Sequence, residues 1–146
     1  MRVEFVIPGT PMGKQRPKFS TVGRYVKAYT PAKTVNYENL VKLEYERQCG
    51  DQRFADDAPI YAMVTAHYEI PKSTSKKKRS QMLTGEILPM KKPDADNILK
   101  VVFDSLNNIA YKDDAQIIYA QLQKKYSDTP NVSVILFDMG ELEVKI

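Results

Sequence analysis

From Ile60 to Ile70, every second residue is apolar, and the residues between them form a more polar set. Because successive side chains of an extended chain point to opposite faces, this pattern predicts a β-strand that buries one face. A shorter alternation over residues 2–7 predicts another strand. Two more alternating segments, residues 115–126 and 131–139, are separated by turn-forming residues and predict a β-hairpin. Residues 140–146 are expected to form a short edge strand or a tail.

Two other segments are predicted to be helices. Thr30 and Pro31 are typical of a helix start, with the threonine hydroxyl at the N-cap, and this helix is expected to run to about Gln48, before Gly50. Apolar residues recur at helical intervals over residues 97–107, which predicts an amphipathic helix of about three turns. The order strand, helix, strand, helix, strand, strand predicts an α+β (mixed α/β) fold in which helices cover a mixed β-sheet.

The overall composition limits the class of protein. The chain of 146 residues is expected to form a single domain, residues 1–146, and its net charge of +4 favours an anionic partner. There is no recognisable secretory signal and no apolar run of about 20 residues, so we expect a cytoplasmic protein outside the membrane. A single cysteine excludes an internal disulfide, and a single histidine leaves too few ligands for a zinc-finger site within one chain.

Positive charge is concentrated in two segments. No acidic residue occurs over residues 6–36, where cations and aromatic rings predict a loop or hairpin that contacts DNA phosphates and stacks on unpaired bases. Four consecutive cations at residues 76–79, in a short predicted helix capped by Ser73 or Ser75, predict a second phosphate contact. A solvated turn and a solvated charge run are the alternatives. The candidate DNA-binding residues are Lys14, Arg16, Lys18, Arg24, Lys76, Lys77, Lys78 and Arg79.

Acidic residues lie on both sides of the second predicted helix. Asp94 and Asp96 precede its apolar stripe, and Asp113 and Asp114 follow it. Six extended residues cover about 20 Å, so the chain can return to the helix start and bring one of the later pair to the earlier pair. Converging carboxylates need a divalent cation to stay ionised, and their hard oxygens favour Mg²⁺ or Mn²⁺. Lys100, one turn beyond Asp96, can hold a phosphate oxygen beside the metal.

Each of these residues also has an ordinary structural explanation. Asp94 or Asp96 alone can cap the helix. Lys100 and Asp104 continue the Asp96 face at intervals of four residues, as an exposed salt-bridged stripe would. The two later aspartates can be turn residues. Capping needs only one aspartate, however, so the combination of several favours a metal site.

The string PDADNILKVVFDSLNN, followed by YKDDAQI, resembles the signature of the RusA family of Holliday junction resolvases. The resemblance is dense over about residues 91–118, and the GxPxxKxRP pattern at residues 9–17 also resembles the N-terminal segment of that family. The resemblance implies a RusA-like fold. By this resemblance Asp94, Asp96 and Asp114 are the metal-binding catalytic carboxylates, Lys100 is the catalytic lysine, and Asp104 and Asp113 match motif positions with a possible supporting role.

The sequence and the resemblance together give a functional hypothesis. The protein is expected to be a Mg²⁺-dependent endodeoxyribonuclease of DNA recombination and repair that uses metal-activated water. The resemblance implies four-way DNA junctions as the substrate, and a homodimer that makes paired symmetric nicks. A nuclease acting on other branched or flap DNA, and a nucleic-acid-binding protein without catalytic activity, are the alternatives. The sequence does not specify the cleavage preference, the number of metals, the dimer interface or a bacterial or phage origin.

Overall fold

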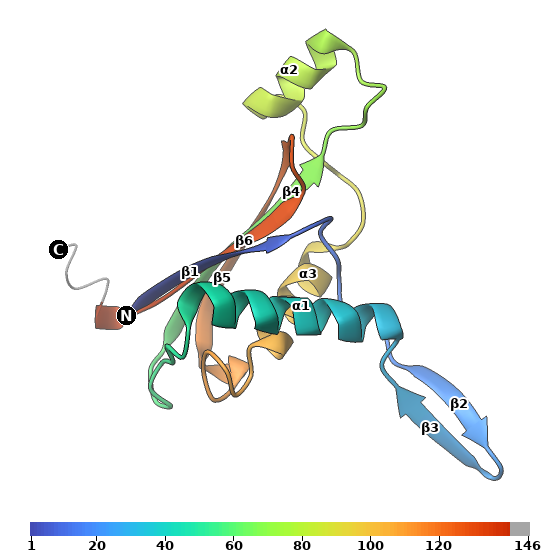
Figure 1. Ribbon diagram of the computed structural model, residues 1–146, viewed down its shortest axis with the longest axis vertical. Helices are drawn as coiled ribbons and strands as arrows, with labels where there is room; N and C mark the ends of the chain where they lie inside the picture. Colours follow the sequence, from blue (N-terminus) through green and yellow to red (C-terminus); the bar gives the residue numbers. More distant parts are fainter. Residues whose placement is uncertain (141–146) are drawn as a thin grey trace.

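The computed structural model describes residues 1–140, apart from the side chain of Val22, and these residues form an α+β fold (Figure 1). In this part of the chain a mixed sheet has the strand order β1-β6-β4-β5. β1 and β4 pair antiparallel with β6, and β5 pairs parallel with β4. The strands are β1 (Arg2–Pro8), β4 (Ile60–Glu69), β5 (Ile117–Ser127) and β6 (Asn131–Asp138). The predicted fold class is confirmed. The edge strand or tail expected at the C-terminal end lies, from residue 141 on, outside the described residues.

The alternating segments form the strands that they predict. Val3, Phe5 and Ile7 of β1 are at most 3% exposed, and their neighbours in sequence are exposed. β4 shows the same alternation and contributes the centre of the core, because Ala62 and Val64 are buried between the sheet and the helices. One face of β1 and of β4 therefore contributes to the core.

The hairpin predicted from residues 115–126 and 131–139 is wrong, although both segments are strands. β4 lies between β5 and β6 and pairs with both of them. The core-facing residues of β4, from Ile60 to Tyr68, are all buried, as expected for a central strand. The three residues that join β5 to β6 therefore span two strand spacings, about 10 Å, and do not form a tight turn.

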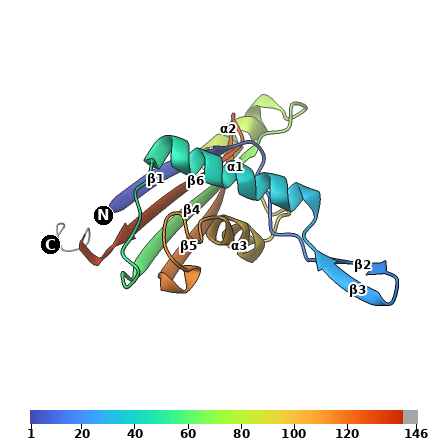
Figure 2. The same ribbon diagram turned by 60° about the horizontal axis from the view of Figure 1, so that its bottom comes forward.

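Two helices cover the core face of the sheet. α1 (Ala32–Cys49) and α3 (Ala95–Ser105) lie side by side on this face (Figure 2). α3 turns an apolar stripe toward the core, as its spacing predicts. The predicted cap of α1 is wrong, because Pro31 occupies the N-cap position without a side-chain hydrogen bond and Thr30 precedes it. The predicted end is confirmed, since Gly50 follows the last residue with a φ of 67°.

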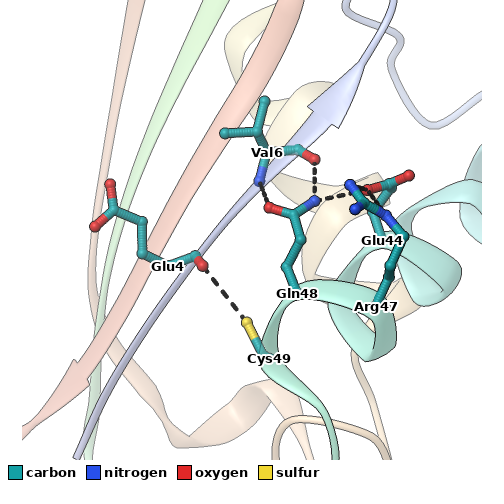
Figure 3. Close-up of polar contacts among 6 residues, drawn as sticks. All are labelled: Glu4, Val6, Glu44, Arg47, Gln48 and Cys49. Atoms are coloured by element: carbon teal, nitrogen blue, oxygen red, sulfur yellow. Dashed lines mark hydrogen bonds and ion pairs between the residues drawn. The ribbon is translucent and has the colours of Figure 1, made fainter.

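The end of α1 closes the outer edge of β1 (Figure 3). The backbone N–H of Val6 donates to the side-chain oxygen of Gln48 at 2.9 Å, and the amide nitrogen of Gln48 donates to the Val6 carbonyl at 2.8 Å. Glu44 accepts a second hydrogen bond from the Gln48 amide at 2.6 Å, which fixes its orientation. At this point the side chain replaces a neighbouring strand and blocks pairing with another chain.

Two segments project from this body (Figures 1 and 2). The hairpin of β2 (Lys18–Val22) and β3 (Tyr25–Tyr29) extends beyond the start of α1, and α2 (Lys76–Thr84) lies beyond the end of β4. Ser75 caps α2 by accepting a hydrogen bond from the backbone N–H of Lys78 at 3.3 Å, as one of the two predicted caps. None of the helices within residues 1–140 combines the length and apolar character needed to cross a bilayer.

Candidate active site

Asp94 and Asp96 lie at the exposed start of α3. Asp94 occupies the N-cap position, but its carboxylate makes no capping hydrogen bond. Instead, its Oδ1 accepts a hydrogen bond from Lys92 Nζ at 2.7 Å, and this hydrogen bond and the charge of Lys92 lower the pKa of Asp94. Asp96 lies in the first turn, where the positive end of the helix macrodipole favours a negative charge. Side-chain capping therefore does not account for these two acids.

A hollow of about 340 Å³ lies next to Asp94, between the loop after β1 and the start of α3. The loop approaches closely because Gly13 has no side chain: a Cβ there would lie 2.8 Å from the Cβ of Pro93 and 2.9 Å from that of Asn97. The backbone N–H of Lys14 donates to the Asn97 carbonyl at 2.9 Å. Gly13 thus allows the loop to pack on the helix start.

Asp114 lies near the other end of α3 and is half-buried. The carboxylates of Asp104 and Asp113 lie beside it. Loss of solvent, and then these two neighbours, raise the pKa of Asp114 to about 6. Asp113 also has a structural task, because its carboxylate accepts a hydrogen bond from the backbone N–H of Ala115 at 2.8 Å and caps the short 3-10 helix η1 (Asp114–Gln116). That hydrogen bond lowers the pKa of Asp113.

Two hydrogen bonds hold Asp114 at this end of the helix. Its backbone N–H donates to Asn107 Oδ1 at 2.8 Å. The hydroxyl of Tyr111, a buried residue, donates to the Phe103 carbonyl at 2.7 Å. These contacts fold the segment after α3 back onto its last turn, so the extended return that the sequence permits does not occur.

The predicted meeting of Asp114 with Asp94 and Asp96 is therefore not found within one chain. Ten residues separate Asp94 from Asp104, which places the two acidic groups about 15 Å apart along the helix axis. Within residues 1–140, no three acidic, histidine or cysteine side chains form a group that could hold a metal ion. The roles of these aspartates stay predictions, but their geometry is that of two separate groups.

Lys14 connects the two ends of α3. Its backbone contacts the helix start, and its ammonium lies 2.8 Å from Glu38 Oε1 and 3.5 Å from Asp104 Oδ2. The side chain is 21% exposed. Burial acts to lower the pKa of Lys14, but the hydrogen bonds and charges of Glu38 and Asp104 together raise it. The sequence predicts a DNA contact for Lys14, whereas the structure engages its ammonium between α1 and α3.

The other predicted cations have varied surroundings. Lys100 is exposed in the middle of α3, one turn from Asp96 and one from Asp104, and it forms no ion pair in the described part of the chain. Arg79 pairs with Asp128. The remaining predicted DNA-binding residues are exposed: Arg16, Lys18, Arg24, Lys76, Lys77 and Lys78.

Three residues that the sequence analysis did not select belong to this region. Lys92 lies two residues before Asp94, a spacing that indicates a local ion pair. Glu38 is the first acid after the long cationic stretch, which marks it as a counter-charge. Asn107, which holds Asp114, gives no signal in the sequence, because its partner is set by how the chain folds back.

The donor chemistry fits Mg²⁺ or Mn²⁺. The candidate ligands are carboxylate oxygens, which hard divalent cations prefer. Mg²⁺ is commonly held by one or two carboxylates and completed by water and substrate phosphate. Asp94 and Asp96 supply two carboxylates without capping hydrogen bonds at the start of α3, so the residues present suit a metal that is completed by substrate.

Comparison with known proteins agrees with this chemistry and places the chain among the endodeoxyribonucleases. The family model of endodeoxyribonuclease RusA matches residues 8–136, so the chain belongs to the RusA family. The chain is also similar to the uncharacterized protein YqaN of Bacillus subtilis (strain 168), with 32% identity over 140 residues that cover 94% of this chain and 97% of the relative. The resemblance drawn from the sequence motifs is thereby confirmed.

Proposed function

We propose that this protein is a divalent-metal-dependent endonuclease that resolves four-way (Holliday) DNA junctions by paired symmetric nicks. The observation that supports it most is the pair of carboxylates at the start of α3, Asp94 and Asp96, which lie beside a cationic loop and make no capping hydrogen bond in a chain of the RusA family. A protein that only binds DNA would gain nothing from two adjacent anions on a basic surface.

Asp94 and Asp96 would hold Mg²⁺ or Mn²⁺ at the start of α3. We place Asp114 in the same site, supplied by the second subunit of a homodimer, because within one chain it is held about a helix length away. When bound, the metal would polarise the phosphodiester and lower the pKa of the attacking water. A twofold dimer would carry two such sites, as paired cuts in opposing strands require.

Lysines of this chain have separate tasks in the proposed site. Lys92 holds the Asp94 carboxylate in place through its hydrogen bond. Lys100 is free of ion pairs in the described residues and lies one turn from Asp96, so its ammonium can neutralise charge that develops on the phosphate. Lys14 holds Asp104, the neighbour of Asp114, and so positions the acidic group at the end of α3.

The proposed DNA path runs over the projecting segments. The exposed cations lie on the loop after β1, on the hairpin and on α2, and they would contact phosphates without reading bases. Neither projecting segment belongs to the buried core in the described structure, so both can adapt to a branched substrate. A DNA-processing nuclease of this kind would act in the cytoplasm.

The test is cleavage of a labelled synthetic four-way junction, with linear duplex and a flap substrate as controls, in Mg²⁺ or in EDTA. Paired, symmetric cuts in the junction only, lost in EDTA, are the expected result. Equal cutting of the flap would assign the protein to nucleases of other branched DNA. Binding without cleavage in either Mg²⁺ or Mn²⁺ would contradict the proposal and leave a nucleic-acid-binding protein.

A further inference from the structure

The hairpin of β2 and β3 presents its side chains to solvent. Every residue of β3 is exposed, and of its two tyrosines Tyr25 is 79% and Tyr29 46% exposed. Figures 1 and 2 show the hairpin extending away from the sheet and helices. Large exposed aromatic side chains on a projecting strand pair are unfavourable in water unless a partner covers them. These exposed side chains therefore indicate that the hairpin binds a ligand.

The strand register separates these side chains onto two faces. Tyr25, Lys27 and Tyr29 alternate along β3 and so share one face. Directly paired residues lie on the same face, and Lys18 pairs with Tyr29 while Phe19 pairs with Ala28. One face thus carries two tyrosines and two lysines, and the other carries Phe19, Thr21, Val26 and Ala28 without any charge.

The charged face has the chemistry that nucleotides require. Lys27 stands between Tyr25 and Tyr29, about 6.6 Å from each along the strand. Alternating cations and flat rings bind a nucleic acid strand by contacting phosphates with the charges and stacking bases on the rings. No acid occurs over residues 6–36, so the surrounding field also attracts an anion.

The nature of the stacking partner follows from base accessibility. Within a continuous duplex both faces of every base pair are covered, so a tyrosine ring has no base to stack on. At a branch point the stacks are interrupted, and base faces are open to a protein ring. We propose that the tyrosine–lysine face of the β2–β3 hairpin, consisting of Lys18, Tyr25, Lys27 and Tyr29, recognises DNA branch points by stacking on exposed bases.

This inference rests on the proposed function only for its choice of branched DNA as substrate. It adds a specificity determinant outside the cleavage site, and it assigns recognition to one face of the hairpin. The uncharged face supplies a control on the same two strands, because substitutions there change exposed apolar area without touching the charges or the tyrosines.

The experiment measures affinity for a four-way junction and for linear duplex, in Ca²⁺ or EDTA so that no cleavage is needed. Tyr25→Ala/Tyr29→Ala should weaken junction binding at least about 10-fold and change duplex binding less than about two-fold. Tyr25→Phe/Tyr29→Phe keeps the rings and should bind as wild type. Phe19→Ala/Val26→Ala should also bind as wild type. Lys18→Gln/Lys27→Gln should weaken binding to both DNAs and reduce the slope of log affinity against log salt by about 2.

Three outcomes would overturn the inference. The first is an equal loss with junction and duplex in the tyrosine variant, which would remove base stacking. The second is an equal loss from the Phe19→Ala/Val26→Ala control. The third is a change in molecular mass by light scattering in either variant, which would make the hairpin a contact between protein copies. If instead the affinities behave as expected but no variant and no wild-type protein cuts DNA, the proposed nuclease function fails and the hairpin assignment stands.

Discussion

The two ends of α3 carry the same kind of side chain in opposite surroundings. At the start, Asp94 is exposed and hydrogen-bonded to Lys92, which lowers its pKa. At the end, Asp114 is half-buried beside Asp104, and its pKa is raised to about 6. Asp94 is thus paired with a lysine, whereas Asp114 is crowded by neighbouring acids and holds a proton more tightly.

The difference indicates what each end lacks. The start has two carboxylates beside an open hollow, which suits a metal completed by other ligands. The end has crowded acids whose repulsion a cation would relieve. If the end of α3 from one subunit met the start of α3 from the other, the metal would gain a further ligand and the crowded acids would gain a cation. This is the physical reason for placing Asp114 in the site of the second subunit.

The largest expected effect is at the start of α3. Asp96→Asn removes a proposed metal ligand and should reduce junction cleavage at least about 100-fold, because a lost metal contact costs several kcal/mol in the transition state. Junction affinity in Ca²⁺ should stay within about two-fold, since the proposed DNA contacts are cations elsewhere. Glu4→Gln, at an exposed position of β1, the sheet edge opposite β5, is the control and should cut normally. Normal cleavage by Asp96→Asn would remove this residue from the mechanism.

Asp114→Asn tests whether the two ends work together, and a comparably large loss of cleavage is expected. Mixing the Asp96→Asn and Asp114→Asn proteins, with subunit exchange verified by mass, then decides how they combine. If each site takes Asp96 from one subunit and Asp114 from the other, a mixed dimer contains one intact site, and single-strand nicking should return. A mixture as inactive as its components would place both residues in the same subunit and contradict the shared site.

The pH dependence of stability should have opposite signs at the two ends. In metal-free protein the pKa of Asp114 is about 6, against an ordinary 3.8, so the folded state binds more protons between about pH 4 and 6. The contribution of Asp114 therefore makes the free energy of unfolding fall as pH rises through that window. Asp114→Asn should remove this fall. The lowered pKa of Asp94 stabilises the fold above its ordinary pKa, and this contribution is lost as pH falls. Thermal unfolding of the wild type, Asp114→Asn and Asp94→Asn in EDTA from pH 3 to 8 measures the two signs.

The sequence predicted the helices and strands better than it predicted which strands pair and which side chains meet. Alternation and helical spacing predicted β1, β4 and α3 because local periodicity determines which face is buried. The pairing of β5 with β4, and not with β6, could not be read from a turn motif, because it depends on which strand is central. The same limit applies to the site. Chain length allowed Asp114 to reach Asp94, and only the Asn107 and Tyr111 hydrogen bonds decide otherwise.

Lys14→Gln tests whether Lys14 stabilises the fold at the end of α3 or contacts DNA phosphate. The ammonium of Lys14 is mostly enclosed by Glu38 and Asp104, so its loss should lower the free energy of unfolding by about 1 to 2 kcal/mol. Glu38→Gln should cost a similar amount and, in the double variant, add little, because both changes break one network. Chemical denaturation measures all three. If Lys14→Gln left stability unchanged and reduced the slope of log DNA affinity against log salt by about 1, Lys14 would contact phosphate instead.

The smallest effect is expected from Lys92→Gln at the opposite end. Its ion pair with Asp94 is solvent-exposed on both sides, with 84% of the Lys92 side chain and 51% of the Asp94 side chain accessible, so water already satisfies both charges. The midpoint of thermal unfolding should not change measurably.

The pKa of Asp94 should rise toward its ordinary value in Lys92→Gln, because the main cause of its lowering has been removed. NMR titration of the carboxyl carbon can follow this change. Since even an ordinary aspartate is ionised at neutral pH, cleavage at pH 8 should change little. A large loss of activity at that pH, with junction affinity intact, would show that Lys92 acts on the phosphate directly and that the start of α3 uses two lysines.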